Sequence, residues 1–262
     1  MDSGFWHTAR ARKLLRRTMM NPYLLEAIAE TPLFDGLSPD RAARAARAFC
    51  LRSYDRGDTI SGAADAEPRT YVMVSGVARS VRVNDDGRCL TSGLLDAGSI
   101  FGRLPYVEDD WTDQTEALVD CRVLRAATAD LEALAGVEPV VARSLARSSG
   151  ARLRSAETRL ASLAFQPVPA RLAGVVIDLA DHFGKVTREG VRIDVALTHG
   201  ALAEMVGTTR ETLTKISGWL RSEDIATIER RVIRVHHWDA LEELQHGTRC
   251  MPGRSSRVGA EL

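Results

Sequence analysis

The stretch VGTTRETLTKISGWLR, residues 206–221, combines charged and apolar side chains at a helical spacing. Leu213, Ile216 and Leu220 recur every three or four positions and predict a buried helix face. The opposite face carries the polar set Arg210, Glu211, Thr214 and Lys215. Arginine can donate two hydrogen bonds to O6 and N7 of guanine, and glutamate can accept one from the amino group of cytosine. The set therefore predicts contacts with base edges in a major groove, with an ordinary solvated face as the alternative.

The residues before this helix predict that it is the second helix of a helix-turn-helix. Leu202 and Val206 are apolar where the first helix would face the second, and Gly207 lies where the turn needs a permissive backbone. Thr198 predicts a cap for the first helix, and Thr208 with Glu211 predicts a capping box for the second. Downstream, IERRVIRV predicts a β-hairpin wing whose arginines contact phosphates, or else an ordinary hairpin. The residues expected to cap helices or contact phosphates are Thr198, Thr208, Thr209, Arg230 and Arg231.

The rest of the chain predicts a second folded unit upstream. A length of 262 residues favours two units, and 35 basic against 35 acidic residues leave DNA to be held by local patches. Residues 21–48 have the pattern of two short helices joined by a turn. Residues 51–125 show short runs of alternating apolar and polar residues separated by glycines. We therefore expect an antiparallel β-roll over residues 21–135. Residues 1–20 form a basic extension, either mobile or a nucleic-acid arm.

A long helix is expected over residues 136–165. Its apolar residues are too sparse for burial in one small domain, but they recur at heptad positions. The expected dimer seam is Leu153, Ala156, Leu160 and Leu163. Packing against the chain's own β-roll is the alternative. The QPVPAR break opens a winged helix-turn-helix over residues 166–246, and residues 247–262 predict a disordered tail.

This order of elements resembles the Crp/Fnr family of bacterial transcription regulators. The resemblance covers roughly residues 33–244 and is most specific in SLAFQPVPARLAGVVIDLADHFG and LTHGALAEMVGTTRETLTKISGWL. It implies an α+β fold and a cytoplasmic homodimer that binds pseudo-palindromic double-stranded DNA with TGTGA-like half-sites and contacts RNA polymerase. Arg210, Glu211 and Lys215 match the family's base-contacting positions. Lys215 stands where arginine is more usual and lacks the bidentate fork.

The same resemblance identifies an effector pocket that departs from the cyclic-AMP-binding pattern. Arg103 replaces the ribose-binding glutamate, and the region of the phosphate-binding arginine has the sequence DQTE at residues 113–116. Carboxylates would repel the cyclic phosphate, so we expect independence of cyclic AMP. The degenerate pocket comprises Gly102, Arg103, Gln114, Thr115, Ala156 and Glu157. The alternative is a regulatory module in which an unidentified small molecule gates DNA binding.

Other functional classes find no support in the sequence. The four cysteines, Cys50, Cys89, Cys121 and Cys250, form no CxxC pair, and the six histidines have no metal-ligand spacing. Cys89 and His7 are weak candidates for a sensor ligand. We expect no metal, no cofactor and no enzyme activity. The basic N-terminal segment has no apolar stretch long enough for a signal peptide or membrane span.

Overall fold

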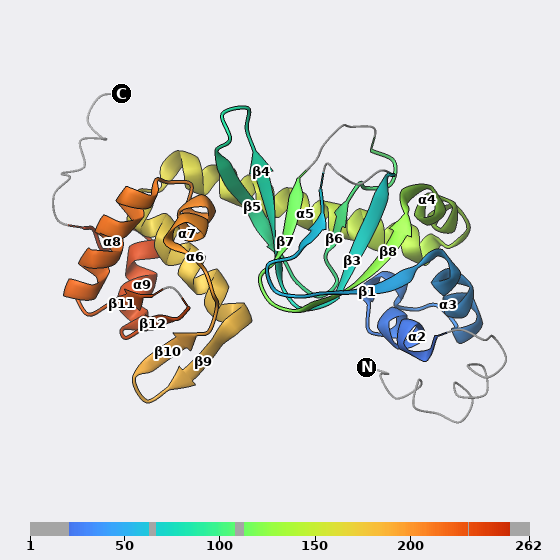
Figure 1. The fold of residues 1–262 in the computed structure, drawn as a ribbon, viewed down its shortest axis with the longest axis horizontal. Helices are drawn as coiled ribbons and strands as arrows, with labels where there is room; N and C mark the ends of the chain where they lie inside the picture. The colour runs from blue at the N-terminus through green and yellow to red at the C-terminus, as the bar shows by residue number, and fades with distance from the viewer. Residues whose placement is uncertain (1–20, 63–66, 108–112, 230, 252–262) are drawn as a thin grey trace. The chain divides into compact units, whose positions relative to one another are not determined.

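The computed structural model describes residues 21–62, 67–107, 113–229 and 231–251 (Figure 1). The chain divides into two compact units, with the boundary between Ala156 and Glu157. The predicted basic extension over residues 1–20 lies outside the described residues. Within the described part of the chain, the helices are too short or too polar to cross a membrane.

The first unit is built on two antiparallel sheets. The strands are β1 (Cys50–Tyr54), β2 (Thr59–Ser61), β3 (Arg69–Ser75), β4 (Ala78–Val83), β5 (Cys89–Leu95), β6 (Ile100–Gly102), β7 (Gln114–Ala117) and β8 (Cys121–Ala127). One sheet has the order β1-β8-β3-β6 and the other β2-β7-β4-β5. The pairs within both sheets are antiparallel, which confirms the predicted β-roll.

Strand β3 explains how the two sheets and the helices share one unit. Successive side chains of a strand point to opposite faces, yet β3 is buried over its whole central part. Tyr71 and Met73 pack in the core between the sheets, where the Tyr71 ring stacks on Phe101 at a centroid distance of 5.4 Å. Val72 and Val74 pack on the other side, in a core formed with the helices.

The helices of the first unit flank this second core. They are α2 (Pro22–Ala29), α3 (Pro39–Ala45), α4 (Thr128–Val137) and the start of α5 (Pro139–Phe165), with two short 3-10 helices at Pro32–Phe34 and Ala46–Ala48. Asn21 caps α2 by accepting a hydrogen bond from the Tyr23 backbone N–H. Ser38 precedes α3 without a side-chain cap hydrogen bond.

Helix α5 changes character along its length. Val141 and Leu145, near its start, are buried in the core of the first unit. Farther along, Leu153 is 60% exposed and Leu160 is 68% exposed in the single chain. The alternative of packing on the chain's own β-roll thus applies to the start of α5, while Leu153 and Leu160 of the predicted seam remain exposed.

The second unit continues from the end of α5 through a proline break. Its elements are α6 (Val168–Phe183), β9 (Gly184–Thr187), β10 (Gly190–Ile193), α7 (His199–Val206), α8 (Arg210–Ser222), β11 (Ala226–Ile228), β12 (Ile233–Val235) and α9 (Trp238–Gln245). The strands form one antiparallel sheet of order β11-β12-β10-β9. Residues 247–251, assigned from the sequence to a disordered tail, continue α9 as a turn in which Thr248 N–H donates to the Glu243 carbonyl. The remainder of that tail, residues 252–262, lies outside the described residues.

Candidate functional site

Helices α7 and α8 pack against one another in the second unit and form the predicted helix-turn-helix (Figure 1). On α8, Leu213, Ile216 and Leu220 are buried against the rest of the unit. The four predicted base-contacting residues are all exposed on the other face: Arg210, Glu211, Thr214 and Lys215. The amphipathic pattern therefore gives the polar set the free face that a contact with DNA requires.

The turn between the two helices corrects the predicted capping box. Gly207 adopts a left-handed conformation with φ 69°, and the Thr208 N–H donates back to the Ala203 carbonyl, so Thr208 still belongs to the end of α7. Thr209 is the N-cap of α8, and its hydroxyl accepts a hydrogen bond of 3.2 Å from the Thr212 N–H. The predicted box on Thr208 was wrong by one residue. Thr198 caps α7, as predicted, by accepting from the Ala201 N–H at 3.1 Å.

Glu211 lies in the first turn of α8 and remains ionised at neutral pH. Hydrogen bonds from its own backbone N–H and from the Thr209 hydroxyl hold the pKa of the carboxyl below its ordinary value. The neighbouring charges of Arg210 and Lys215 act in the same direction. The start of the recognition face thus carries an ionised hydrogen-bond acceptor, Glu211, close to the cations Arg210 and Lys215.

Thr214 is exposed, but its hydroxyl is already engaged within the unit. The Oγ1 atom donates to the Arg210 carbonyl at 2.8 Å and lies 3.4 Å from Nδ1 of His199. Thr214 can therefore contact a base only by accepting a hydrogen bond at its hydroxyl oxygen or through its methyl group. His199, at the start of α7, is a neighbour of the recognition face that the sequence pattern does not single out.

Strands β11 and β12 form the predicted hairpin behind α8. Arg231, between the strands, is exposed and therefore available to a phosphate. Arg234 lies 3.5 Å from Glu229 in an ion pair. Arg230, the other predicted phosphate contact, lies outside the described residues.

Two partly buried arginines, which the sequence pattern does not single out, donate hydrogen bonds to the backbone of the turn. Arg171 of α6 donates to the carbonyls of Val206 at 3.0 Å and Gly207 at 3.1 Å. Arg159 of α5 donates to the carbonyl of Met205. The available signal was an arginine within the otherwise apolar start of α6, in PARLAGVV, but its partners are backbone atoms far along the chain.

In the first unit, the acidic segment that replaces the family's phosphate-binding arginine is paired internally. Asp113 accepts hydrogen bonds from Ser80 Oγ at 3.0 Å and Arg82 Nε at 3.2 Å, and its carboxylate lies 3.6 Å from Arg152 of α5. The Asp113 side chain is 8% exposed. Glu116 likewise pairs with Arg79 at 2.7 Å. Arg79, Arg82 and Arg152 therefore each already lie against a carboxylate of the chain, and Arg82 and Arg152 share the same one.

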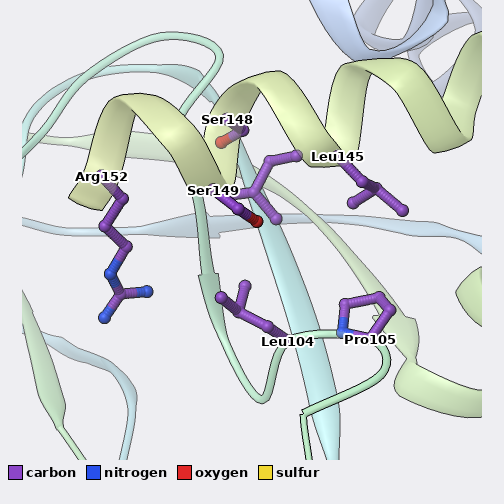
Figure 2. Close-up of a pocket in the computed structure, with 7 residues that line it drawn as sticks. Leu104, Pro105, Leu145, Ser148, Ser149 and Arg152 are labelled. Carbon is purple, nitrogen blue, oxygen red and sulfur yellow. The ribbon is translucent and has the colours of Figure 1, made fainter. Parts of the chain in front are cut away.

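A small pocket lies beside the first of these pairs (Figure 2). Leu145, Ser148, Ser149 and Arg152 approach it from α5, and Leu104 and Pro105 from the loop after β6. Ile100 completes the lining, and the empty volume of about 290 Å³ includes space open to solvent. None of the six residues predicted for a degenerate effector pocket, all of which the structure describes, belongs to this lining.

Most of the predicted pocket residues make contacts of their own within the first unit. Gly102 has φ 79°, and an added Cβ would lie 2.6 Å from the Arg69 carbonyl, so this glycine serves the backbone packing of β3 and β6. Thr115 is buried and accepts a hydrogen bond from Ser61 at 3.0 Å, and Gln114 donates to Thr59. The Arg103 carbonyl accepts a hydrogen bond from the Thr70 hydroxyl. The remaining two predicted residues are exposed on α5: Ala156 and Glu157.

The cysteines of the first unit do not assemble a ligand set. Burial raises the pKa of the Cys121 thiol to about 11, which keeps it protonated and poorly nucleophilic. Cys89 is partly buried, and its thiol lies 3.9 Å from the Gly87 carbonyl. Among the described residues, no cluster of three or more His, Cys, Asp or Glu side chains could hold a metal ion. His7 lies outside that part of the chain.

Comparisons with known proteins agree with both units. The family model of the Crp-like helix-turn-helix domain matches residues 170–244, and that of the cyclic nucleotide-binding domain matches residues 51–136. A solved transcriptional regulator of the CRP/FNR family from Thermus thermophilus superposes with a TM-score of 0.62 at 25% identity, over 75% of this chain and 98% of that chain. The chain belongs to the Crp/Fnr family.

Two relatives in the Crp/Fnr family are named for different regulatory signals, nitrogen and cyclic AMP. The global nitrogen regulator of Synechocystis is 29% identical over 196 residues, which is 74% of this chain and 87% of the relative. The cyclic AMP receptor protein of Thermus thermophilus is 29% identical over 218 residues, which is 83% of this chain and 98% of the relative. The family relation establishes a DNA-binding transcription regulator rather than an enzyme.

Proposed function

We propose that this Crp/Fnr-family chain acts as a homodimer that binds a pseudo-palindromic site in double-stranded DNA without cyclic AMP. The observation that carries the proposal is the exposed set Arg210, Glu211, Thr214 and Lys215 on the free face of α8. An anionic Glu211 on a surface meant only for phosphates would be repelled, so its place beside Arg210 favours recognition of bases.

The homodimer is supported by the uncovered apolar residues of α5. Leu153 and Leu160 are more than half exposed at heptad spacing, and Ala156 and Leu163 complete the same seam. A second copy of α5 would cover them. Two α8 helices related by a two-fold axis would then bind half-sites about one helical turn apart, and the family resemblance suggests TGTGA-like half-sites and a contact with RNA polymerase.

Independence of cyclic AMP is supported by Asp113. A cyclic phosphate needs a cation with free hydrogen-bonding capacity, but Arg82 and Arg152 both lie against the Asp113 carboxylate. Adding a phosphate would place two anionic groups at the same pair of cations. Electrostatic repulsion would oppose binding there.

The second candidate function is effector-gated DNA binding. Arg152, Ser148 and Ser149 bring polar groups to the pocket of Figure 2, beside apolar Leu104 and Leu145. A small ligand with one anionic group would compete with Asp113 for Arg152. Native mass spectrometry of the purified full chain separates the two candidates, because a retained small molecule would support this second one.

Selection of bound sequences from random duplex DNA tests the main proposal. The full-length protein, without added nucleotide, is expected to enrich an inverted repeat whose halves are about 10 base pairs apart from centre to centre. Enrichment of no shared sequence, or of a single unrepeated element, would contradict the proposed mode of binding.

A further inference from the structure

The end of α7 receives an unusual share of arginine hydrogen bonds. The final carbonyls of a helix have no partners inside that helix. Here Met205 O accepts from Arg159, while Val206 O and Gly207 O accept from Arg171 at 3.0 and 3.1 Å. Two guanidinium groups therefore cap one helix end, where positive charge is also favoured by the helix dipole.

These arginines connect the turn to other elements of the second unit. Arg171 also donates to the Gln166 carbonyl at 2.9 Å, so one guanidinium bridges the break between α5 and α6 and the turn before α8. Arg159 belongs to α5, close to the predicted seam residue Leu160. Among the described residues, neither arginine forms an ion pair with a carboxylate, so backbone carbonyls are their principal partners. Arg159 is partly buried, and this burial lowers the pKa of its guanidinium, opposed by the nearby charge of Asp178.

The bonded carbonyls lie immediately before the recognition helix. Only Thr208 separates Gly207 from Thr209, the N-cap of α8. Fixing these carbonyls therefore restricts where Arg210 and Glu211 can lie. We infer that Arg159 and Arg171 are positioning residues, which fix the recognition helix relative to α5 and α6 and thereby set the spacing and orientation of the two DNA-binding faces. The part concerning DNA rests on the proposed function.

Amide hydrogen exchange of the full-length protein without DNA tests the positioning contact directly. In Arg171→Met and Arg159→Met, amides of residues 203–213 are expected to exchange about tenfold faster than in the wild type, because charge-assisted hydrogen bonds are lost. Amides of α9, residues 238–245, should keep their rate. Arg154→Met, an exposed arginine on α5, is the matched control and should change neither region.

The lysine variants keep the test decisive if either methionine variant fails to fold. Arg171→Lys retains the charge but not the fork, so exchange in residues 203–213 should be intermediate between wild type and methionine. Unchanged exchange in Arg171→Lys and Arg159→Lys would overturn the inference. An equal acceleration in residues 203–213 and in α9 would also overturn it, because that pattern indicates general destabilisation.

Binding to duplexes of varied half-site spacing tests the consequence for DNA recognition. Wild type should prefer one spacing, and Arg159→Met should lose about 2- to 30-fold of the discrimination against a spacing longer by one base pair. An Arg159→Met profile identical to that of wild type would overturn the coupling to α5. If wild type itself recognises no inverted repeat, the proposed function fails, while the exchange experiment still decides whether the arginines hold the turn.

Discussion

Arg210 occupies the first position of α8, where its guanidinium is exposed and next to a carboxylate that stays ionised. If it donates two hydrogen bonds to a guanine, Arg210→Ala should cost roughly 1–3 kcal/mol of binding free energy and flatten the preference at that base pair. Titration against specific and scrambled duplexes at several salt concentrations measures both effects. Equal weakening on the two duplexes would mean that α8 is only an electrostatic surface.

Arg231 provides the contrasting control for Arg210. It is exposed between β11 and β12, where a phosphate contact would carry no sequence information. Arg231→Ala should weaken binding to both duplexes alike and reduce the salt slope by about one unit. A selective loss on the specific duplex would instead assign Arg231 to a base contact.

At the scale of single residues, the sequence predicted which helix face a side chain lies on better than it predicted hydrogen-bond partners. The 3.6-residue period placed Arg210 and Lys215 opposite Leu213, as the structure confirms. Whether Thr208 or Thr209 caps α8 depends on the left-handed backbone conformation of Gly207, which cannot be read from the residue types. Arg171 was missed because its partners are carbonyls 35 and 36 positions away.

At the scale of elements, alternation and glycine punctuation were enough to predict the antiparallel strands of the first unit. The pattern did not reveal that β3 is buried on both faces, because that depends on helices packing over Val72 and Val74. Residues of the predicted effector set likewise have packing roles that the pattern did not reveal. Thr115 and Gly102 satisfy packing between strands, while the pocket is lined from α5 and the loop after β6.

The exposed seam of α5 gives a prediction for the element itself. Leu160→Ala should weaken the dimer about ten- to a hundredfold, because two copies of the side chain leave the same seam. Sedimentation equilibrium measures the dissociation constant. Thr158→Ala, exposed on α5 two residues away and off the seam, is the control and should leave the constant unchanged. A Leu160→Ala dimer as tight as wild type would assign the self-association to another surface.

At the scale of the whole molecule, Asp113 and Glu116 of the first unit occupy arginines that a cyclic phosphate would otherwise contact. Isothermal titration calorimetry with cyclic AMP should detect no binding at micromolar concentrations, because the Asp113 carboxylate already lies against Arg82 and Arg152 and would repel a phosphate there. Affinity for the selected duplex should be the same with and without the nucleotide. Micromolar or tighter binding of cyclic AMP would overturn this interpretation of the pocket.

In the proposed function, two copies of the chain recognise one inverted repeat together. The most direct measurement is a stoichiometric titration of the full-length protein against the selected duplex and against the same duplex with one half-site scrambled. We predict two chains per intact duplex and, because the two contacts are linked, at least about a hundredfold weaker binding when one half-site is lost. One chain per duplex, or equal affinity for the intact and half-scrambled sites, would contradict recognition by a homodimer.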